Sequence, residues 1–228
     1  MSGAPPDGQH GPHVLVESVD QPAVEDDDRH HLDRVLRLRA GDPITVGDGV
    51  GRWRPCRWGP SVEPVGDIVA VERSEPRLGV AFALIKGGRP ELVVQKLVEL
   101  GIDDLRPFAA DRSVVRWDDV KAAKNHERLE RVAREAVMQC RRVWLPTVHP
   151  VADFATVAAL PGAARADHGA EAPTLANPTI LIGPEGGWSE AERGVDVPAV
   201  GLSNAILRAE TAAIAAGALL AARRDLTT

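Results

Sequence analysis

The sequence predicts an α/β protein of two domains: a small β-barrel, then an α/β domain with a mostly parallel sheet. Short strands separated by turn residues fill the first 70 residues, and Asp48-Gly49-Val50-Gly51 is a hairpin signal between two of them. From Leu78 onward, apolar strands alternate with helical segments, a pattern typical of parallel strands joined by helices. Because Ser74-Glu75-Pro76 separates the two patterns, we place the domains at residues 1–73 and 74–228.

The first domain is expected to contain four short strands and one short helix. Residues 1–13 are polar and rich in Gly and Pro, so we expect them to form a flexible tail. Hydrophobic patterning and turn signals predict strands at 14–19, 43–46, 53–58 and 67–72, and a helix at 27–38.

The second domain is expected to alternate between strands and helices. Apolar runs predict strands at 79–85, 105–109, 164–167, 179–182 and 197–202. Helical periodicity predicts helices at 90–101, 118–142, 153–160 and 212–222. Pro90 suits the first position of its helix, since a proline there loses no helical hydrogen bond.

A strand, a glycine-rich turn and a helix follow one another in the most informative stretch. Strand 179–182 stops at Gly183-Pro184-Glu185-Gly186-Gly187. Ser189 then offers a helix N-cap, with Glu192 as its capping-box partner. Open α/β sheets bind ligands at such strand ends. The Glu185 carboxylate would repel an anion, so the turn suits a ligand with a cationic group.

A second strand end repeats this arrangement nearby. Strand 197–202 leads into residues 203–211 and then into the alanine-rich helix 212–222. Because sequential strands are usually neighbours, we expect the two loops to form one composite site. His168 is a further candidate for its wall. The residues expected to contact a ligand are Ile182, Gly183, Pro184, Glu185, Gly186, Gly187, Leu202, Ser203, Ile206 and Leu207.

These two stretches, LIGPEGGWSEAE and LSNAILRAETAA, resemble the ribosomal RNA small-subunit methyltransferase E family. Four further blocks in the same order are similar to that family: 30–42, 86–101, 112–115 and 135–146. The resemblance implies a SPOUT-type domain with a trefoil knot, preceded by a PUA-like RNA-binding domain. It also implies S-adenosylmethionine as cofactor, a homodimer, and methylation of one uridine of 16S ribosomal RNA at N3 in the small ribosomal subunit.

Three positions depart from the family's usual residues. The family usually has Gly, Arg and Thr where this chain has Ser203, Ala205 and Ala209. Glycine tolerates positive φ, so a serine at 203 is expected to cost roughly 1 kcal/mol and to weaken cofactor binding. Arg208 and Glu210 are retained, which favours an active enzyme.

Arg208 and Glu210 are the expected catalytic residues. Uracil N3 carries a proton, and a cationic donor near O2 or O4 stabilises the anion formed when this proton leaves. Arg208 is our candidate for that role, and either Glu210 or a water accepts the proton. Because N3 lies on the Watson–Crick edge, the target must be unpaired or flipped out.

Charge is distributed unevenly along the chain. The net charge is −6, yet residues 74–150 carry 14 Lys or Arg against 11 Asp or Glu. The charge of a local surface region attracts phosphates more strongly than the net charge of the whole chain does. The polar face of helix 118–142 is therefore either a solvated surface or a phosphate-contacting ridge. The residues expected to bind RNA are Arg112, Arg116, Arg128, Arg131, Gln139 and Arg142.

Composition argues against a membrane span and a metal site. No apolar run approaches the 18 residues or so that a spanning helix needs. Cys56, Cys140 and the seven histidines lack metal-ligand spacing. The first 13 residues lack the features of a signal peptide, so we expect a protein of the reducing cytoplasm.

Two other functions fit parts of the sequence. The departures at Ser203, Ala205 and Ala209 suit a non-catalytic RNA-binding or ribosome-assembly protein that keeps the fold. The Gly-Pro-Glu-Gly-Gly turn also suits a nucleotide-dependent enzyme with a phosphate-binding loop. The absence of a following Lys-Ser or Lys-Thr argues against this second reading.

Overall fold

The computed structural model describes residues 3–226 and divides into two compact units. One unit comprises Met1–Ser74 with Arg134–Leu145, and the other comprises Glu75–Ala133 with Pro146–Thr228. The division falls inside helix α3 (Asp119–Cys140), whose last residues belong to the first unit. The sequence analysis had assigned residues 134–145 to the second domain.

Residues 134–145 belong to the first unit because their side chains are bonded and buried there. Arg134 donates a hydrogen bond from Nη2 to the Leu15 carbonyl at 3.2 Å, and its Nη1 lies 2.8 Å from an Asp28 carboxylate oxygen. Trp144 donates from Nε1 to the Val71 carbonyl at 3.0 Å. Helical periodicity runs unbroken through α3 and carries no sign of this change of unit.

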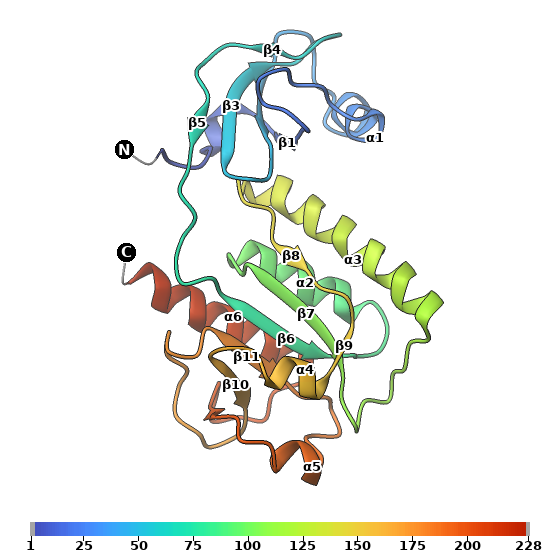
Figure 1. Ribbon diagram of the computed structural model, residues 1–228. Coiled ribbons are helices and arrows are strands. Elements are labelled where there is room, and N and C mark those ends of the chain that lie inside the picture. Colours follow the sequence, from blue (N-terminus) through green and yellow to red (C-terminus); the bar gives the residue numbers. More distant parts are fainter. Residues whose placement is uncertain (1–2, 227–228) are drawn as a thin grey trace. The chain divides into compact units, whose positions relative to one another are not determined.

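The first unit is built on a five-stranded sheet (Figure 1). The strand order is β1-β2-β3-β4, with β5 beside β3, and only the β1–β2 pair is parallel. Gly49 and Gly51 have positive φ in the β2–β3 hairpin, and Asp48 accepts hydrogen bonds from the backbone of Val50 and Arg52. The strands are β1 (His13–Leu15), β2 (Pro43–Gly47), β3 (Arg52–Arg57), β4 (Glu63–Pro64) and β5 (Val69–Ala70).

The helical segment between β1 and β2 is shorter than expected. It consists of α1 (Asp26–His30) and the π-helical turn η2 (His31–Val35). Leu32 places its side chain in the apolar core of the unit, and Arg37 ends the segment in the left-handed region with φ of 57°. A left-handed residue cannot continue a right-handed helix, so the expected extension to residue 38 does not form.

The expected flexible tail is wrong for residues 3–13. The Gly3 amide donates to the Ala70 carbonyl at 2.9 Å, and the Trp53 indole donates to the Ala4 carbonyl at 2.9 Å. A one-turn helix, η1 (Gly8–His10), follows. Backbone pairing of this kind cannot be read from the amino-acid composition of the segment. Residues 1 and 2 lie outside the described residues.

The second unit contains a seven-stranded sheet in which every pairing is parallel, where the sequence predicted a mostly parallel sheet. Its order is β12-β10-β11-β6-β7-β8, with β9 beside β7. The two-residue strands β8 and β9 were not predicted. The strands are β6 (Gly79–Ala83), β7 (Asp104–Ala109), β8 (Thr147–Val148), β9 (Ala152–Asp153), β10 (Ala163–Ala166), β11 (Thr179–Ile182) and β12 (Ala199–Val200).

Helices cover both faces of this sheet (Figure 1). Phe154 of α4 packs with Ala81, Leu181 and Phe108 on one face. Helix α6 packs against β6 and β11 of the sheet and against helix α2, and Gly217 of α6 allows the close approach to α2 because a Cβ there would lie 2.7 Å from Leu97. The helices not yet given are α2 (Arg89–Glu99), α4 (Phe154–Ala158), α5 (Glu190–Arg193) and α6 (Ala209–Asp225).

A buried ion pair ties the end of α6 to the sheet. Arg224 Nη1 lies 2.7 Å from Asp103 Oδ2, and both side chains are almost fully buried. Asp103 also accepts a hydrogen bond from the Leu78 amide at 3.0 Å. None of the helices in residues 3–226 has the length and apolar character that a membrane crossing requires. The trefoil knot implied by the resemblance stays a prediction.

His13 is a buried histidine in the core of the first unit. Its Nδ1 lies 2.9 Å from Thr45 Oγ1, and it packs so closely on Gly47 that a Cβ there would lie 2.8 Å from the ring. Burial, assisted by the nearby Arg141, lowers the pKa of His13 to about 4. The imidazole is therefore neutral in the folded protein at neutral pH.

We predict that His13 makes the first unit acid-sensitive. Above pH 6.5 both folded and unfolded states hold a neutral ring; between about 6.5 and 4 the unfolded chain takes up the proton first. The free energy of unfolding should fall by about 3 kcal/mol over this window because of His13 alone. Urea unfolding at a series of pH values should show a weaker pH dependence in His13→Gln than in the wild type.

The matched control is His31→Gln, because His31 is exposed. Its pH dependence should follow the wild type. Equal slopes for His13→Gln and wild type between pH 6.5 and 4 would contradict a buried neutral histidine.

Candidate functional site

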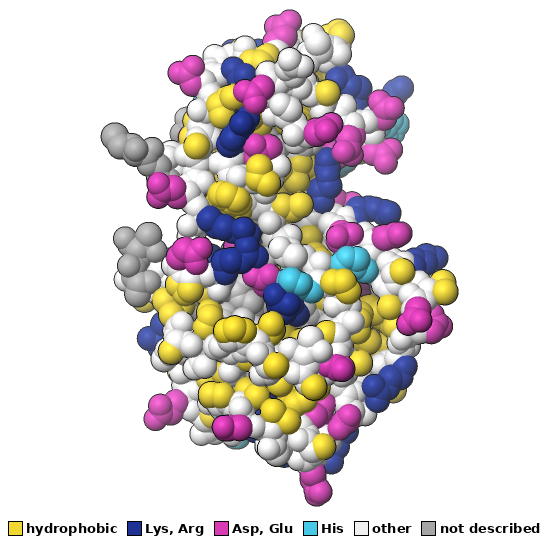
Figure 2. Space-filling model, viewed as in Figure 1, with side chains coloured by type: hydrophobic (Ala, Val, Ile, Leu, Met, Phe, Trp, Pro, Cys, Tyr) yellow, Lys and Arg dark blue, Asp and Glu magenta, His cyan; other side chains and the backbone are white. Residues whose placement is uncertain are grey.

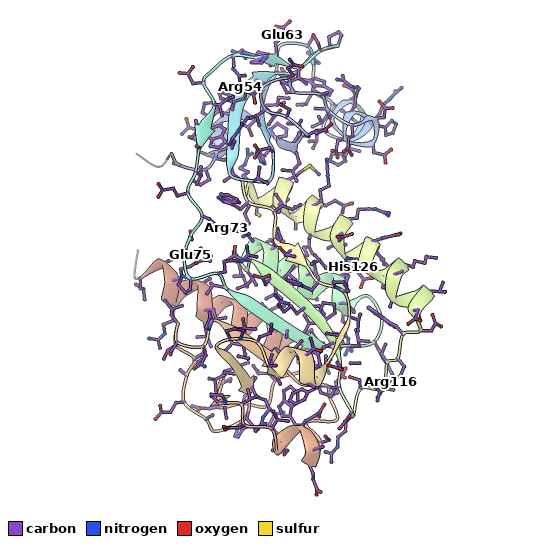
Figure 3. The ribbon with its side chains drawn as sticks, in the orientation of Figure 1. Arg54, Glu63, Arg73, Glu75, Arg116 and His126 are labelled. Atoms are coloured by element: carbon purple, nitrogen blue, oxygen red, sulfur yellow. The ribbon has the colours of Figure 1, made fainter. Side chains whose placement is uncertain are left out.

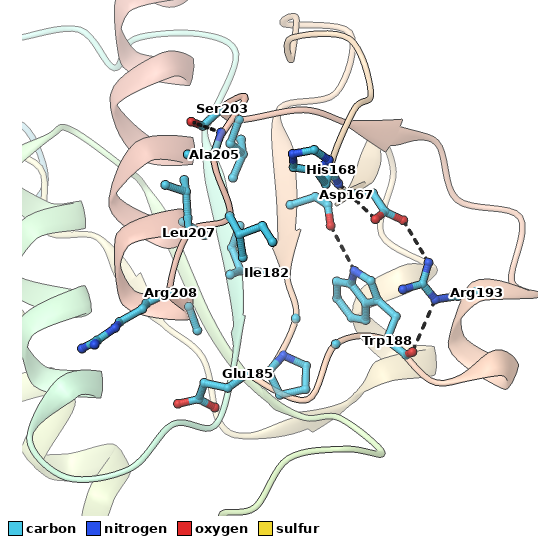
Figure 4. A pocket seen from close by; sticks show the side chains of 18 residues that line it. Asp167, His168, Ile182, Glu185, Trp188, Arg193, Ser203, Ala205, Leu207 and Arg208 are labelled. Atoms are coloured by element: carbon cyan, nitrogen blue, oxygen red, sulfur yellow. Dashed lines mark hydrogen bonds and ion pairs between the residues drawn. The ribbon is translucent and has the colours of Figure 1, made fainter.

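A cavity of about 530 Å³ opens at the carboxyl edge of the parallel sheet in the second unit (Figure 4). Three chain segments supply most of its wall: residues 166–168 at the end of β10, residues 182–188 at the end of β11 except Gly186, and residues 202–209 after β12 except Asn204. Arg193 and Ala212 complete it. Because parallel strands all end at the same edge, the segments that follow them meet there.

The two loops predicted to share this site do come together, but not for the predicted reason. Their strands, β11 and β12, are not neighbours, because β10 pairs with both of them. The register of β12 on β10 places Ala199 opposite Arg165. The segment after β10 therefore lies between the two loops. His168 lines the cavity, and its Nε2 lies 3.1 Å from the Asn204 carbonyl.

Trp188 forms a rigid wall of the cavity. Its ring stacks on Phe108 with centroids 6.2 Å apart, and its Nε1 donates to the Ala166 carbonyl at 3.0 Å. A Cβ on Gly183 would lie 2.9 Å from this indole, so glycine is needed for the close approach. Gly187, with φ of 67°, closes the turn by donating to the Pro184 carbonyl at 2.9 Å.

The predicted capping box forms, and it also braces the loop from outside. The Glu192 carboxylate is buried and accepts from two backbone amides: Ser189 at 2.7 Å and Asp111 at 2.9 Å. Ser189 Oγ donates to Asp111 Oδ2 at 2.6 Å. The start of α5 is thus fastened to the segment after β7.

Gly186 does not line the cavity, although the sequence placed it among the ligand-contacting residues. A Cβ there would lie 3.1 Å from the backbone oxygen of Arg112. The close contact with the Arg112 backbone therefore explains why position 186 is a glycine. The other nine expected residues line the cavity.

The loop after β12 accommodates its unusual residues without backbone strain. The only described residues other than glycine with positive φ are Arg37 and Arg141, so Ser203 carries no left-handed penalty. Its Oγ accepts a hydrogen bond from the Ala205 amide at 3.0 Å. Ile206 also lines the cavity while 92% exposed, which leaves an apolar surface free for a ligand.

The expected catalytic residues Arg208 and Glu210 are not paired with one another. Arg208 is the N-cap residue of α6, and Figure 4 shows its guanidinium directed away from Trp188. Glu210 faces Arg89, with Oε1 3.6 Å from Nε, and it is absent from the cavity wall. Arg89 also lies 3.5 Å from a Glu185 carboxylate oxygen.

Arg89 is a site residue that the sequence analysis did not single out. It begins α2 and joins the two carboxylates that follow β11 and begin α6. The block Lys86-Gly87-Gly88-Arg89 was noted only as part of the resemblance. The available signal was a cation directly after the Gly87-Gly88 pair, at the start of the helix that follows β6.

The cavity combines apolar walls with charges of both signs. Asp167 lies 3.6 Å from Arg193 and 3.8 Å from Arg165, and Glu185 stands at the opposite side (Figure 4). Apolar side chains such as Ile182 supply much of the remaining wall. Such a cavity suits a ligand with a flat apolar part and both amino and carboxylate groups.

The six residues expected to bind RNA are divided between the units. Arg112, Arg116, Arg128 and Arg131 belong to the second unit, and Gln139 and Arg142 belong to the first. On the face seen in Figure 2, basic and acidic side chains are interspersed.

Arg112, Arg116 and Arg128 already have protein partners, and Arg112 donates a hydrogen bond to the Gly186 carbonyl at 3.4 Å. Arg128 is ion-paired to Glu91 at 2.9 Å, and Arg116 donates to the Asp111 carbonyl at 2.8 Å. Figure 3 labels Arg116 in the second unit. Arg131 and Gln139 are exposed, whereas Arg142 is half-buried. In the part of the chain that the structure describes, no three His, Cys, Asp or Glu side chains are arranged to hold a metal ion.

Comparison with known proteins defines the class first. A family model described as an RNA methyltransferase domain matches residues 72–221, and one described as an RNA methyltransferase PUA domain matches residues 24–57. Ribosomal RNA small subunit methyltransferase E of Bacillus subtilis is 30% identical over 92% of this chain and 93% of its own length. The namesake of Synechocystis is 30% identical over 80% of this chain and 67% of its own. This chain belongs to the ribosomal RNA small subunit methyltransferase E family.

Solved structures agree with this assignment. The crystal structure of the Neisseria gonorrhoeae ribosomal RNA small subunit methyltransferase E, bound to S-adenosyl methionine, superposes with a TM-score of 0.76. The two proteins are 26% identical, and the match covers 95% of this chain and 98% of the other. The predicted family and the predicted fold class are both confirmed.

We predict that the Glu192 carboxylate stabilises the second unit. Glutamine has one acceptor oxygen where the carboxylate has two, so Glu192→Gln leaves one buried backbone amide unsatisfied. The expected loss is about 1–3 kcal/mol in the free energy of unfolding. Glu190→Gln, an exposed change in the same helix, is the control and should unfold like the wild type in urea. Equal midpoints for both variants would contradict the bracing role of Glu192.

Proposed function

We propose that this chain transfers a methyl group from S-adenosylmethionine to N3 of one uridine in 16S ribosomal RNA. The observation that carries the proposal is the cavity at the ends of β10, β11 and β12, built from the two loops that carry the family resemblance. The substrate is the small ribosomal subunit or its RNA, and the reaction takes place in the cytoplasm.

The cavity suits S-adenosylmethionine in shape and charge. Ile182, Leu202 and Leu207 offer an apolar surface for the adenine, and the exposed Ile206 side chain lies at the same wall. Glu185 offers a carboxylate to the amino group or the sulfonium. When bound, the cofactor supplies an electrophilic methyl group on a positively charged sulfur.

Arg208 is our candidate for a catalytic residue. It lines the cavity, and no ion pair occupies its guanidinium within the described residues. Its reorientation toward the uracil would place a donor near O2 or O4, where negative charge develops as the N3 proton leaves. Glu210 faces Arg89, so we assign it to positioning the start of α6 and assign the proton to water.

RNA recognition is shared between the two units in this proposal. The PUA-type unit and the exposed Arg131 and Gln139 contact the RNA backbone outside the cavity. A homodimer, with each site completed by the partner subunit, is the assembly we propose. No metal takes part.

The two alternative functions are less well supported. Ser203 has ordinary backbone geometry and its side chain serves the loop, so it gives no reason to expect an inactive site. A phosphate-binding role for the glycine-rich turn conflicts with the carboxylate of Glu185 beside it.

We predict that the purified protein forms 3-methyluridine in small ribosomal subunits. The subunits come from a strain in which the gene has been deleted, and S-adenosylmethionine is the donor. Mass spectrometry of the rRNA nucleosides should show 3-methyluridine absent before the reaction and present after it. Its presence in the untreated deletion strain would contradict the proposal.

Arg208→Ala is the informative variant in this assay. Since its donor acts mainly as the uracil becomes anionic, the single-turnover rate should fall by about 100-fold or more, the loss typical of one transition-state donor. Its affinity for S-adenosylmethionine should stay near that of the wild type. A wild-type rate would remove Arg208 from the catalytic role.

We predict that a substitution at Gly187 weakens the binding of S-adenosylmethionine in the cavity. Gly187→Val adds a branched side chain at a cavity-lining position of positive φ, and the S-adenosylmethionine dissociation constant should rise tenfold or more in calorimetry. Gly41→Val is the matched control, because Gly41 also has positive φ and open space around it but belongs to the first unit. Wild-type affinity in a folded Gly187→Val protein would place the cofactor elsewhere.

A further inference from the structure

A second cavity, of about 220 Å³, lies in the second unit at the carboxyl end of β6. Its walls come from residues 85–87, the first turn of α2, the segment after β7 and the first half of α3. It shares no lining residue with the larger cavity. Because β6 pairs in parallel with β11, the two cavities open at the ends of adjacent strands.

The smaller cavity has the side chains of a nucleotide-binding site. Lys86, Lys121 and Arg128 bring three cations to it, and Trp117 brings an aromatic ring. Lys86 and Lys121 are exposed, and within residues 3–226 neither is ion-paired to a carboxylate. Cations beside an aromatic ring are the usual means of holding single-stranded RNA, since the ring stacks on a base and the cations contact phosphates.

Two of the residues that line this cavity carry a polar group without a hydrogen-bond partner among the described residues. Trp117 is half-buried, and its indole N–H donates no hydrogen bond to any described residue. Glu91 is ion-paired to Arg128 through Oε1, while its Oε2 is buried and has no hydrogen-bond partner in the described part of the chain. A ligand with a donor group, such as a base amide or a ribose hydroxyl, would satisfy that oxygen.

We propose that this cavity binds one unpaired nucleotide next to the methylated uridine, with its base stacked on Trp117 and its phosphate on Lys86 and Lys121. The proposal rests on the function proposed above. The cavity is smaller than the roughly 300–1,000 Å³ typical of small-molecule sites, so it suits a single base.

The nucleotide in this cavity is a neighbour of the target and not the target itself. Arg89 precedes the cavity-lining Pro90 and is ion-paired to Glu185 and Glu210 on the side of the larger cavity. A base on Trp117 is therefore separated from the cofactor cavity by a row of charged side chains. Extruding the target uridine unstacks its neighbours, which frees one of them to stack on the protein.

The test measures binding and turnover with the same small subunits from the deletion strain. Trp117→Ala should raise both the filter-binding dissociation constant and the KM for subunits by about tenfold, the loss expected for one stacked base. It should leave kcat and S-adenosylmethionine affinity near wild type. Trp117→Phe keeps an aromatic face and should recover most of the affinity.

Two lysine variants test the phosphate contact. Lys121→Ala should lower the slope of log dissociation constant against log salt by about one, since one phosphate contact is lost. Lys124→Ala is the matched control, an exposed lysine of the same helix that does not line the cavity, and its slope should match the wild type.

Failure of this proposal is distinct from failure of the methylation. Wild-type binding and KM in Trp117→Ala, or equal losses in the Ala and Phe variants, would overturn the stacking site even if methylation occurs. Absence of 3-methyluridine formation by the wild type would overturn the proposed function. The filter-binding series would still decide whether Trp117 holds RNA.

Discussion

The double pairing of β10, with β11 on one side and β12 on the other, is the constraint on which the site depends. It places three strand ends in one row, so that three segments distant from one another in sequence line a single cavity. Removing β10 from between its neighbours would separate the two loops that carry the family resemblance. The strand order and the register of the sheet therefore determine where the site forms.

The walls of the cavity are held by contacts outside it. Trp188 is fixed by stacking on Phe108, and the start of α5 is fixed by the Glu192 carboxylate. Arg89 joins Glu185 to Glu210 and so links the loop after β11 to the start of α6. These supports lie on β7, α2 and α5, so the shape of the cavity depends on elements that contribute few residues to its wall.

Local sequence signals predicted the local parts of this structure well. The capping box at Ser189 and Glu192 uses residues three positions apart, and a short range of sequence contains it completely. The order of strands was not predictable in the same way, because the pairing of β12 with β10 depends on contacts over more than 30 residues. For the same reason the sequence expected a free tail at residues 3–13 and kept residues 134–145 in the second domain. Gly186 was misassigned because a glycine needed against protein looks the same in sequence as one needed against a ligand.

Hydrogen–deuterium exchange of the full chain with and without S-adenosylmethionine tests the composite cavity most directly. If one ligand touches all three strand ends, exchange should slow together in residues 166–168, 183–187 and 203–207, with one saturation curve for the three segments. Slowed exchange in only one of the three segments, or in none, would contradict a single cofactor site built across β10.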